Sequence, residues 1–507
     1  MQEKLPPLAF YSEQKGEVIL GHLVSPETGD LTNVPLRLSR ERHFHTAFCG
    51  DTGYGKSVAA ERLVYETTLH WKLKTIVLDF GAGWRKLMNA PGLEGRVEIR
   101  QLSPGGVRPL RWNPLQIGRN ILPEVQWRAF CDIFGSIAKL GQRRQVHELR
   151  DALRRIYLAA GVLVDDPECR QDPQWGFVQP GEELAAFSHQ LSDVDGEPVG
   201  AGTPLALLTA DSRQLLAVHR SKLVGLATLY REIEEKLRTV PPRDSMLRGV
   251  LEGILFRLHP LVQGAAAVQY AAGEEAIDLN EIVPGSQGIH PKEGSAPVHT
   301  NGWGVPSPEG RHTGFVEAWG VAVLEGGAFL DDFSKAFLLG WAAWHLYTDA
   351  VILRMKRGAT RPAHIQIVFE EANKILAGLD STSSDDESGQ STAEQFANMW
   401  RDSRKYGIWL HLITQSPSLI PPGILSSCNN IFVSQLKNPR DRDLAVAALH
   451  RSEKGFVDEA WRRFLASLPV ARTVAKLGYA FDRAEVEPCY IQPLMLDAQE
   501  PSDGEIG

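Results

Sequence analysis

The sequence contains few cysteines, and they are scattered along the chain. The five are Cys49, Cys131, Cys169, Cys428 and Cys489, and no two of them form a CxxC pair. A disulfide framework or a structural zinc site needs paired or regularly spaced cysteines, so we expect neither. Unpaired cysteines are typical of a reducing compartment, and we therefore expect a cytoplasmic protein.

Long apolar runs and an excess of basic residues are also missing. The amino-terminal stretch MQEKLPPLAF lacks the basic start and apolar core of a signal peptide. No run approaches the roughly 18 apolar residues of a membrane helix. We expect no membrane span, and the nearest run, 337–344, is expected to form a buried helix. Because the formal net charge is −8, DNA contact is expected only at a local surface, such as a pore lined by a few loops.

The order of segments along the chain predicts an α/β protein whose core is split in sequence. Residues 1–40 carry short alternating apolar segments, which predict a small, reduced barrel-like β element. Residues 41–120 follow a strand, glycine turn, helix and strand pattern, which is typical of a parallel sheet. Residues 121–316 are mostly helical in periodicity, and the α/β pattern returns in 317–507. We therefore predict an ATPase-type core interrupted by a helical insertion.

Two segments are expected to be surface loops. Residues 283–315 are rich in glycine and proline and show no periodicity. Their histidines, His290, His299 and His312, are too widely spaced for a compact ligand set, so we expect no metal site there. Residues 378–392 are acidic and rich in serine.

One motif carries the strongest chemical signal in the chain. It matches GxxxxGK[ST], follows the apolar strand expected at 46–49, and opens the helix expected at 57–70. Glycines let successive N–H groups face phosphates, and the helix amino terminus adds its positive end. The lysine can contact the β- and γ-phosphates and the serine hydroxyl can bind Mg²⁺. We therefore predict ATP and Mg²⁺ at Gly50, Asp51, Thr52, Gly53, Tyr54, Gly55, Lys56 and Ser57.

Hydrolysis also needs an acidic group at the end of a strand. One expected strand ends at Asp79, and another ends at the adjacent pair Glu370 and Glu371. Two adjacent acids suit two tasks, so we assign Glu370 to the metal and Glu371 to the general base. The alternatives are an acidic helix start for the pair and a loop-shaping role for Asp79.

The last expected strand of the site, 408–414, is followed by Gln415. An amide there can contact both the attacking water and the γ-phosphate, so Gln415 is predicted to sense the bound nucleotide. Several cations precede this strand, and one of them can act as an arginine finger in a neighbouring subunit. The alternative is that these cations compensate a helix dipole.

These residues resemble the HerA-type ATPases, which belong to the HerA and FtsK branch of hexameric DNA motors and have a RecA-like P-loop core. The matching segments are GDTGYGKS (50–57), EEAN (370–373), SRKYG (403–407), ITQSP (413–417) and ILSSCNNIFVSQLKNPRDRD (424–443). The stretches LDFGAGWRK (78–86) and WNPL (112–115) are more similar to ATPases of type IV secretion and conjugation. The resemblance covers residues 16–116 and 317–490.

The resemblance implies the same roles for the P-loop, the acidic pair and Gln415. It makes Arg404 the expected trans-acting finger, with Arg401 and Lys405 as rivals. Three departures stand out. Glu370 occupies a position where many relatives have aspartate, the amino-terminal element is short for a partner-docking barrel, and 283–315 has no counterpart.

The function implied is an ATP-driven DNA translocase or helicase that forms a homo-hexameric ring around duplex DNA. Its implied partner is a nuclease or another effector enzyme, in DNA processing or anti-phage defence. Two alternatives stay open: a conjugation or type IV secretion ATPase, and a nucleotide-dependent scaffold for a partner enzyme.

Overall fold

The computed structural model describes residues 6–11, 15–140, 143–183, 191–283, 319–328, 330–357, 365–376, 392–450, 458–478 and 487–506. The three histidines of the expected loop at 283–315, and nearly all of the expected acidic loop at 378–392, lie outside these residues. The chain divides into two compact units. The sheet unit comprises Met1–Gln101, Asn280–Ala328 and Ala359–Gly507, and the helical unit comprises Leu102–Leu279 and Phe329–Gly358.

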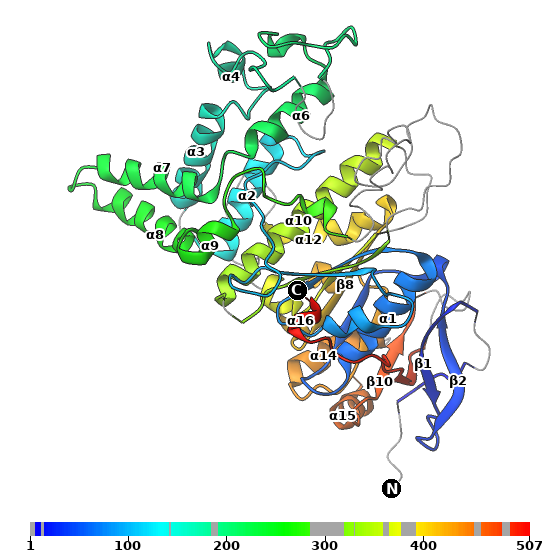
Figure 1. The fold of residues 1–507 in the computed structure, drawn as a ribbon. Helices are drawn as coiled ribbons and strands as arrows, with labels where there is room; N and C mark the ends of the chain where they lie inside the picture. The colour runs from blue at the N-terminus through cyan, green and yellow to red at the C-terminus, as the bar shows by residue number, and fades with distance from the viewer. Residues whose placement is uncertain are drawn as a thin grey trace. The chain divides into compact units, whose positions relative to one another are not determined.

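The sheet unit is built on one sheet, which has eleven strands among the described residues, in the order β2-β1-β11-β10-β9-β3-β8-β7-β4-β6-β5 (Figure 1). A parallel block runs from β9 to β5. Its strands are β3 (Thr46–Cys49), β4 (Lys74–Asp79), β5 (Val97–Gln101), β6 (Gly320–Glu325), β7 (Ile365–Phe369), β8 (Ile408–Thr414) and β9 (Asn430–Val433). The antiparallel strands are β1 (Val18–Val24), β2 (Leu31–Leu38), β10 (Thr473–Lys476) and β11 (Cys489–Pro493).

Parallel pairing brings the carboxyl ends of the strands to one edge of the sheet, which we call the carboxyl edge. Cys49 at the end of β3 is in register with Thr414 at the end of β8. Asp79 at the end of β4 is likewise in register with Glu325 at the end of β6. Ligand sites of open α/β sheets form at this kind of edge.

The short amino-terminal β element exists as the hairpin β1–β2, but it extends the central sheet instead of forming a separate barrel-like element. Strand β1 pairs with β11, with Gly21 opposite Pro493. The apolar side chains of β1 join the core of the sheet unit, and Arg62 of the first long helix donates to the carbonyl of Ile19 at 3.0 Å. The hairpin therefore buries its apolar face against the sheet unit.

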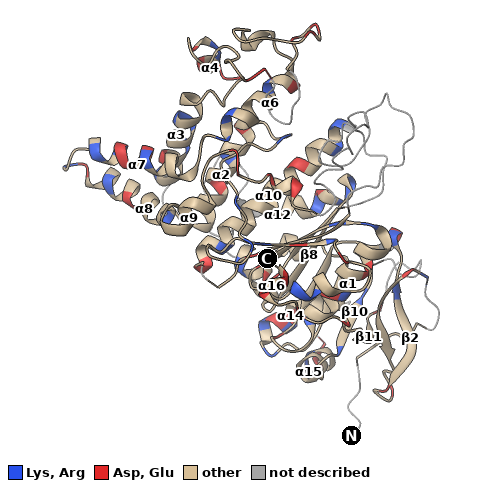
Figure 2. Cartoon of the chain, in the orientation of Figure 1, with Lys and Arg blue, Asp and Glu red and all other residues tan. Residues whose placement is uncertain are grey.

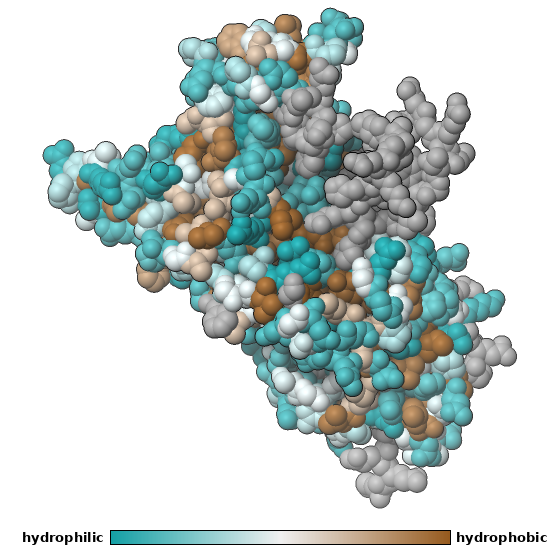
Figure 3. Space-filling model, viewed as in Figure 1, coloured by the Kyte–Doolittle hydropathy of each residue, from teal (hydrophilic) through white to brown (hydrophobic). Residues whose placement is uncertain are grey.

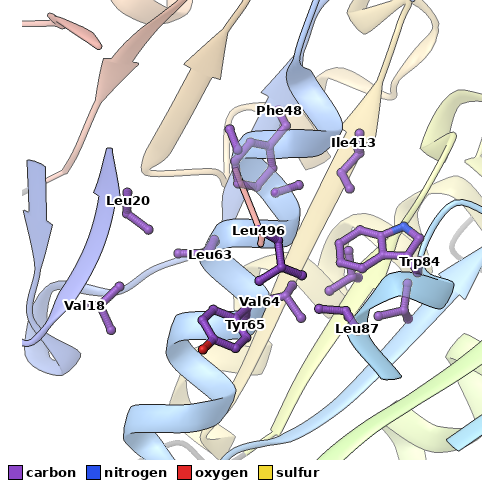
Figure 4. Close-up of a cluster of buried hydrophobic side chains, with 14 of the residues drawn as sticks. Val18, Leu20, Phe48, Leu63, Val64, Tyr65, Trp84, Leu87, Ile413 and Leu496 are labelled. Carbon is purple, nitrogen blue, oxygen red and sulfur yellow. The ribbon is translucent and has the colours of Figure 1, made fainter. Parts of the chain in front are cut away.

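The sheet unit also contains helices and short 3-10 turns, which connect its strands. The α-helices are α1 (Lys56–Trp71), α11 (Ala372–Leu376), α12 (Thr392–Asp402), α13 (Pro422–Leu425), α14 (Pro439–Leu449), α15 (Glu459–Ser467) and α16 (Asp503–Ile506). The 3-10 turns are η1 (Arg40–Arg42), η2 (Arg85–Asn89), η4 (Leu279–Glu281), η6 (Ser403–Tyr406) and η7 (Pro417–Leu419). The main core contains side chains from α1, the strands, η2 and the carboxyl-terminal segment, as Figure 4 shows for Val64, Leu87 and Leu496.

The helical unit is assembled around aromatic side chains. Its helices are α2 (Pro123–Ile137), α3 (Arg143–Ala159), α4 (Pro167–Gln171), η3 (Leu205–Leu207), α6 (Ala210–Ser221), α7 (Leu226–Thr239), α8 (Ser245–Val262), α9 (Gly264–Gln269) and α10 (Asp332–Arg357). Phe130 of α2 makes edge-to-face contacts with Phe337 and Trp341 of α10. Aromatic pairs of this geometry add stability beyond the area that they bury.

The boundaries of the two units along the chain differ from the expected ones. The first part of the core was expected to end at 120 and the insertion at 316, whereas the units divide after Gln101 and after Leu279. Helix α10, expected in the second half of the core, belongs to the helical unit. The reason is that α10 directs its aromatic side chains at α2, a tertiary preference that helical periodicity does not reveal.

Helix α10 is also longer and more apolar than expected. Among the described residues, one helix, Asp332–Lys356, has the length and composition to cross a membrane, and 78% of its most apolar window is buried inside the protein. Lys335 and Asp349 interrupt its apolar run, so the sequence shows no uninterrupted apolar stretch of that length. The expectation that 337–344 forms a buried helix agrees with the structure, since Phe337, Trp341 and their apolar neighbours are buried.

The surface carries both signs of charge. Helices α7 and α8 contain both basic and acidic residues (Figure 2), and Arg155 of α3 pairs with Glu232 of α7 at 2.7 Å. The face shown in Figure 3 is mostly hydrophilic with separate apolar patches. These helices therefore do not present the single-sign basic face that electrostatic DNA binding uses.

Candidate functional site

The P-loop motif lies where the sequence predicted it, between β3 and α1. Its first residues are tied to the neighbouring strands, because Gly50 N–H donates to the Thr414 carbonyl at 3.2 Å and Asp51 N–H donates to the Gln435 carbonyl at 2.8 Å. The Asp51 carboxylate in turn accepts from Lys437 N–H at 3.0 Å. The loop is therefore fixed by backbone contacts on both sides of β3.

Two glycines of the loop have conformations that other residues rarely adopt. Gly53 has a φ of +85° and Gly55 a φ of +94°. A Cβ at Gly55 would lie 3.2 Å from the Cα of Ala471, so the close approach of that backbone also favours glycine. Gly55 is the residue before α1, and it has no side chain to cap the first N–H groups of this helix. The positive end of the helix is thus available to an anion.

Lys56 and Ser57, the first residues of α1, face the acidic pair after β7. The Nζ of Lys56 lies 4.0 Å from Oε1 of Glu371. The Ser57 hydroxyl donates to Oε1 of Glu370 at 3.3 Å. The structure therefore brings together the cation, the hydroxyl and the two carboxylates that the sequence analysis assigned to one site.

Glu371 and Gln415 form a chain of contacts with the P-loop. The Gln415 amide donates from Nε2 to Oε1 of Glu371 and accepts, at Oε1, from the Thr52 hydroxyl at 2.6 Å. Gln415 follows β8 and Glu371 follows β7, so parallel pairing of these strands places both at the carboxyl edge. The predicted sensor thus bridges the predicted base and the phosphate loop.

Glu370 is held in an environment that disfavours its charge. Burial raises its pKa to about 8, and the neighbouring Asp79 carboxylate adds to that rise, whereas the Lys56 ammonium opposes it. Its second oxygen, Oε2, accepts from the indole N–H of Trp84 at 3.2 Å. Both carboxylate oxygens of Glu370 are therefore engaged by donors.

Asp79 is buried and shapes the loop that follows β4. Its two carboxylate oxygens accept from Gly81 N–H and Gly83 N–H, each at 2.8 Å. Burial raises its pKa to about 7, although the Gly81 N–H favours the charged form. This geometry supports the loop-shaping alternative for Asp79.

Arg404 lies away from the P-loop of its own chain. It precedes β8, and its guanidinium lies 4.2 Å from the ring centroid of Phe44, which precedes β3. Arg404 is thus at the amino edge of the parallel strands, whereas the P-loop follows the carboxyl end of β3. The two other candidate finger residues also contact side chains close in sequence: Arg401 contacts Asn398, and Lys405 pairs with Asp402.

Sequence reasoning assigned no role to Trp84, Arg85 or Glu325. Trp84 contacts Glu370, and Arg85 makes two hydrogen bonds to the buried Glu325, at 2.7 Å and 2.9 Å. The stretch LDFGAGWRK resembles a family segment, and the two glycines on either side of its alanine are a signal for a tight loop. No local pattern marks Glu325, because its partner lies 240 positions away.

The chain is similar to one known protein in sequence over a short region, and to several solved structures in fold. No family model matches the chain. It is 34% identical over 59 residues to the DNA double-strand break repair helicase HerA of Pyrococcus furiosus, a match that spans 12% of this chain and only 11% of that relative. The resemblance to HerA-type ATPases is therefore confirmed over a short region.

Solved structures match over nearly the whole chain. VirB4 of Thermoanaerobacter pseudethanolicus aligns with a TM-score of 0.54 and 14% identity, covering 96% of this chain and 99% of that chain. The plasmid coupling protein TrwB in complex with ADP and Mg²⁺ aligns with a TM-score of 0.50 and 14% identity, covering 97% and 92%. The predicted α/β, RecA-like P-loop ATPase fold with a helical insertion is thus confirmed.

Proposed function

We propose that this chain is an ATP-hydrolysing motor of the P-loop class. The observation that carries the proposal is the contact chain Thr52–Gln415–Glu371–Lys56, which joins the phosphate loop, a sensor amide, a carboxylate and a cation at one edge of the sheet. A phosphate loop alone binds nucleotide, whereas hydrolysis also needs a positioned base. Glu371 supplies that base.

The oxygen donors Ser57 and Glu370 fit Mg²⁺, which prefers hydroxyl, carboxylate and water ligands. Ser57 would hold the ion directly and Glu370 would hold it through water. The ion neutralises charge on the phosphates when it is bound. Lys56 and the N–H groups at the start of α1 bind and orient the β- and γ-phosphates, Glu371 takes a proton from the attacking water, and Gln415 reports the γ-phosphate to Glu371.

We further propose that the motor is a homo-hexameric ring that moves duplex DNA. The similarity to a DNA repair helicase supports this reading. Arg404 supports the ring, because it lies over Phe44 at the amino edge, away from its own P-loop, so a role at a nucleotide would have to be at that of a neighbouring subunit. A nuclease or effector partner, in DNA processing or anti-phage defence, remains part of the proposal.

A second candidate is a conjugation or secretion motor. The fold likeness to VirB4 and to the coupling protein TrwB extends over nearly the whole chain, and it favours this reading as a specific alternative. Its substrate would be a protein or the DNA of a mobile element.

The test compares phosphate release by the wild-type protein and by Lys56→Ala, with and without duplex DNA. We expect Mg²⁺-dependent turnover that DNA stimulates, and none in the variant, because Lys56 is the cation that faces the phosphates. Turnover by Lys56→Ala at the wild-type rate would contradict the site. Nucleotide binding without turnover, with or without DNA, would instead favour a scaffold. Turnover that DNA leaves unchanged would favour a secretion motor that acts on a protein substrate.

A further inference from the structure

Trp84 makes a contact that the chemistry of hydrolysis does not itself require. It ends the loop that follows β4, and the residue is 1% exposed. The indole N–H donates to Oε2 of Glu370 at 3.2 Å, while Oε1 of the same carboxylate faces the Ser57 hydroxyl at 3.3 Å. The indole therefore occupies one oxygen and leaves the other directed at the P-loop serine.

The position of Trp84 is enforced by the structure on both sides of it. Before it, the Asp79 carboxylate fixes the loop through Gly81 and Gly83. After it, Arg85 is anchored to the buried Glu325. The Trp84 ring lies in the main core beside Leu87, as Figure 4 shows. The indole is thus held rigidly enough to impose an orientation on Glu370.

A buried indole usually finds an acceptor, so the contact could merely satisfy Trp84. Trp461, which is also fully buried in the sheet unit, shows that this fold tolerates a buried indole N–H without an acceptor in the part of the chain that the structure describes. Among the described residues, its Nε1 has no hydrogen-bond partner. A hydrogen bond to an ionised carboxylate is stronger than one between neutral groups, so the indole N–H favours the charged form of Glu370 that burial opposes. Glu370 is also the residue assigned to the metal.

We propose that Trp84 is a positioning residue, whose indole N–H orients the Glu370 carboxylate for Mg²⁺ at Ser57. The inference rests on the proposed function, which assigns Glu370 to Mg²⁺. Partners that orient a metal-binding carboxylate typically contribute about 10-fold or more to metal affinity or activity.

The experiment titrates Mg²⁺ at saturating ATP in wild-type protein, Trp84→Phe and the matched control Trp461→Phe. Phenylalanine keeps an aromatic ring at each position and removes the N–H, which has an acceptor at Trp84 only. We expect the half-saturating Mg²⁺ concentration to rise about 10-fold in Trp84→Phe, with turnover largely restored at high Mg²⁺. The control should titrate like the wild type, and equal titrations for all three proteins would overturn the proposal.

Two further measurements keep the test decisive. If the wild type binds nucleotide but does not hydrolyse it, the proposed function fails, and the Mg²⁺ dependence of binding a fluorescent ATP analogue still reads out the role of Trp84. If Trp84→Phe does not fold, benzothienylalanine at position 84 keeps the ring size and replaces the N–H by sulfur. An unchanged Mg²⁺ dependence in either measurement would contradict the positioning role.

Discussion

Glu371 has a backbone φ of +52°, a left-handed conformation that costs a non-glycine residue about 1–3 kcal/mol. The conformation turns the chain sharply between β7 and α11. It brings the Glu371 side chain to Gln415 and within 4.0 Å of the Lys56 ammonium. Glycine would relax this backbone but would remove the carboxylate. The strain is therefore retained where a charged side chain is needed.

Replacing Glu371 by glutamine keeps the shape of the side chain and removes the charge that polarises water. We expect Glu371→Gln to bind ATP and to hydrolyse it at least about tenfold more slowly, since loss of a general base typically costs 10²–10⁴-fold. Equilibrium binding of a fluorescent ATP analogue and single-turnover phosphate release would measure the two effects separately.

The matched comparison is Asp79→Asn, which also converts a strand-end carboxylate to an amide. Asp79 now accepts hydrogen bonds from two glycine N–H groups. In the variant, the NH₂ group of the amide would face one of these N–H donors, at a cost of about 1–3 kcal/mol in stability. We expect a lower midpoint of thermal unfolding and a smaller loss of hydrolysis than in Glu371→Gln. If Glu371→Gln hydrolysed ATP at the wild-type rate and Asp79→Asn did not, the assignment of the general base to the end of β7 would be wrong.

Among the elements, those with a strong local pattern could be predicted from the sequence. The segment that contains β3, the P-loop and α1 was predictable, because its apolar strand, its glycines and the start of its helix are adjacent in the chain. The contact between Trp84 and Glu370 was not, because it joins residues 286 positions apart. That Arg404 precedes β8 could be read from the sequence, but its contact with Phe44 beside β3 depends on strand order, which periodicity does not encode.

Turn η2 is anchored to the sheet by an ion pair whose acidic partner is fully buried. The Glu325 side chain is 0% exposed and accepts from both Arg85 and Gln101. We expect Arg85→Ala to lower the free energy of unfolding by about 3–5 kcal/mol, because it leaves a buried carboxylate without its cation. Chemical denaturation would measure the change.

Two controls separate this burial effect from a general loss of charge. Arg238→Ala removes an arginine whose side chain is 69% exposed and paired with Glu234, so its effect should stay below about 1 kcal/mol. Adding Glu325→Met to Arg85→Met should recover much of the loss, since an apolar pair needs no partner charge. A double variant as unstable as Arg85→Ala would refute the ion-pair explanation.

A buried histidine group at the amino edge makes folding sensitive to acid. The ring of His43 contacts the rings of Trp409 and His411. Burial lowers the pKa of His45 to about 4 and that of His411 to about 3, and it lowers the pKa of His43 well below its ordinary value of 6.5. These histidines are neutral in the folded protein.

Because the folded pKa values lie below the unfolded one, the unfolded chain binds more protons below pH 6.5. Stability is therefore present above pH 6.5 and is lost as the pH falls toward 4, by about 1.4 kcal/mol per pH unit for each histidine. Asp79 and Glu370 act oppositely, because their raised pKa values of about 7 and 8 let the folded protein keep protons that the unfolded chain releases above about pH 4. Their contribution to stability is therefore lost as the pH rises from about 4 to those values. His411→Gln should reduce the acid slope by about one proton in denaturation series between pH 4 and 6.5. An unchanged slope would contradict the assignment.

For the molecule as a whole, the separation of Arg404 from its own P-loop makes a ring testable in solution. We expect Arg404→Ala to bind ATP and lose turnover, because the cation completes a neighbour's site when charge develops on the γ-phosphate. Mixing it with Glu371→Gln should restore part of the ATPase activity. A mixed ring contains interfaces at which an intact Glu371 meets an intact Arg404 from the next subunit.

The control mixture combines Lys56→Ala with Glu371→Gln. These two residues share one subunit's half of the site, within 4.0 Å of each other, so no interface in that mixture has both intact and activity should not return. Recovery in both mixtures, or in neither despite mixed rings seen by native mass spectrometry, would rule out the trans role.

The strand that leads into the P-loop has neighbours from far along the chain. Within the described part of the chain, strand β3 (46–49) pairs with β8 and β9, which end at Thr414 and Val433. A ribosome therefore makes the phosphate loop long before the strands that hold it and the residues that complete its site. Contacts this distant in sequence form slowly. Nucleotide cannot guide the early folding of the nascent chain, and the growing polypeptide stays catalytically silent until most of it has emerged.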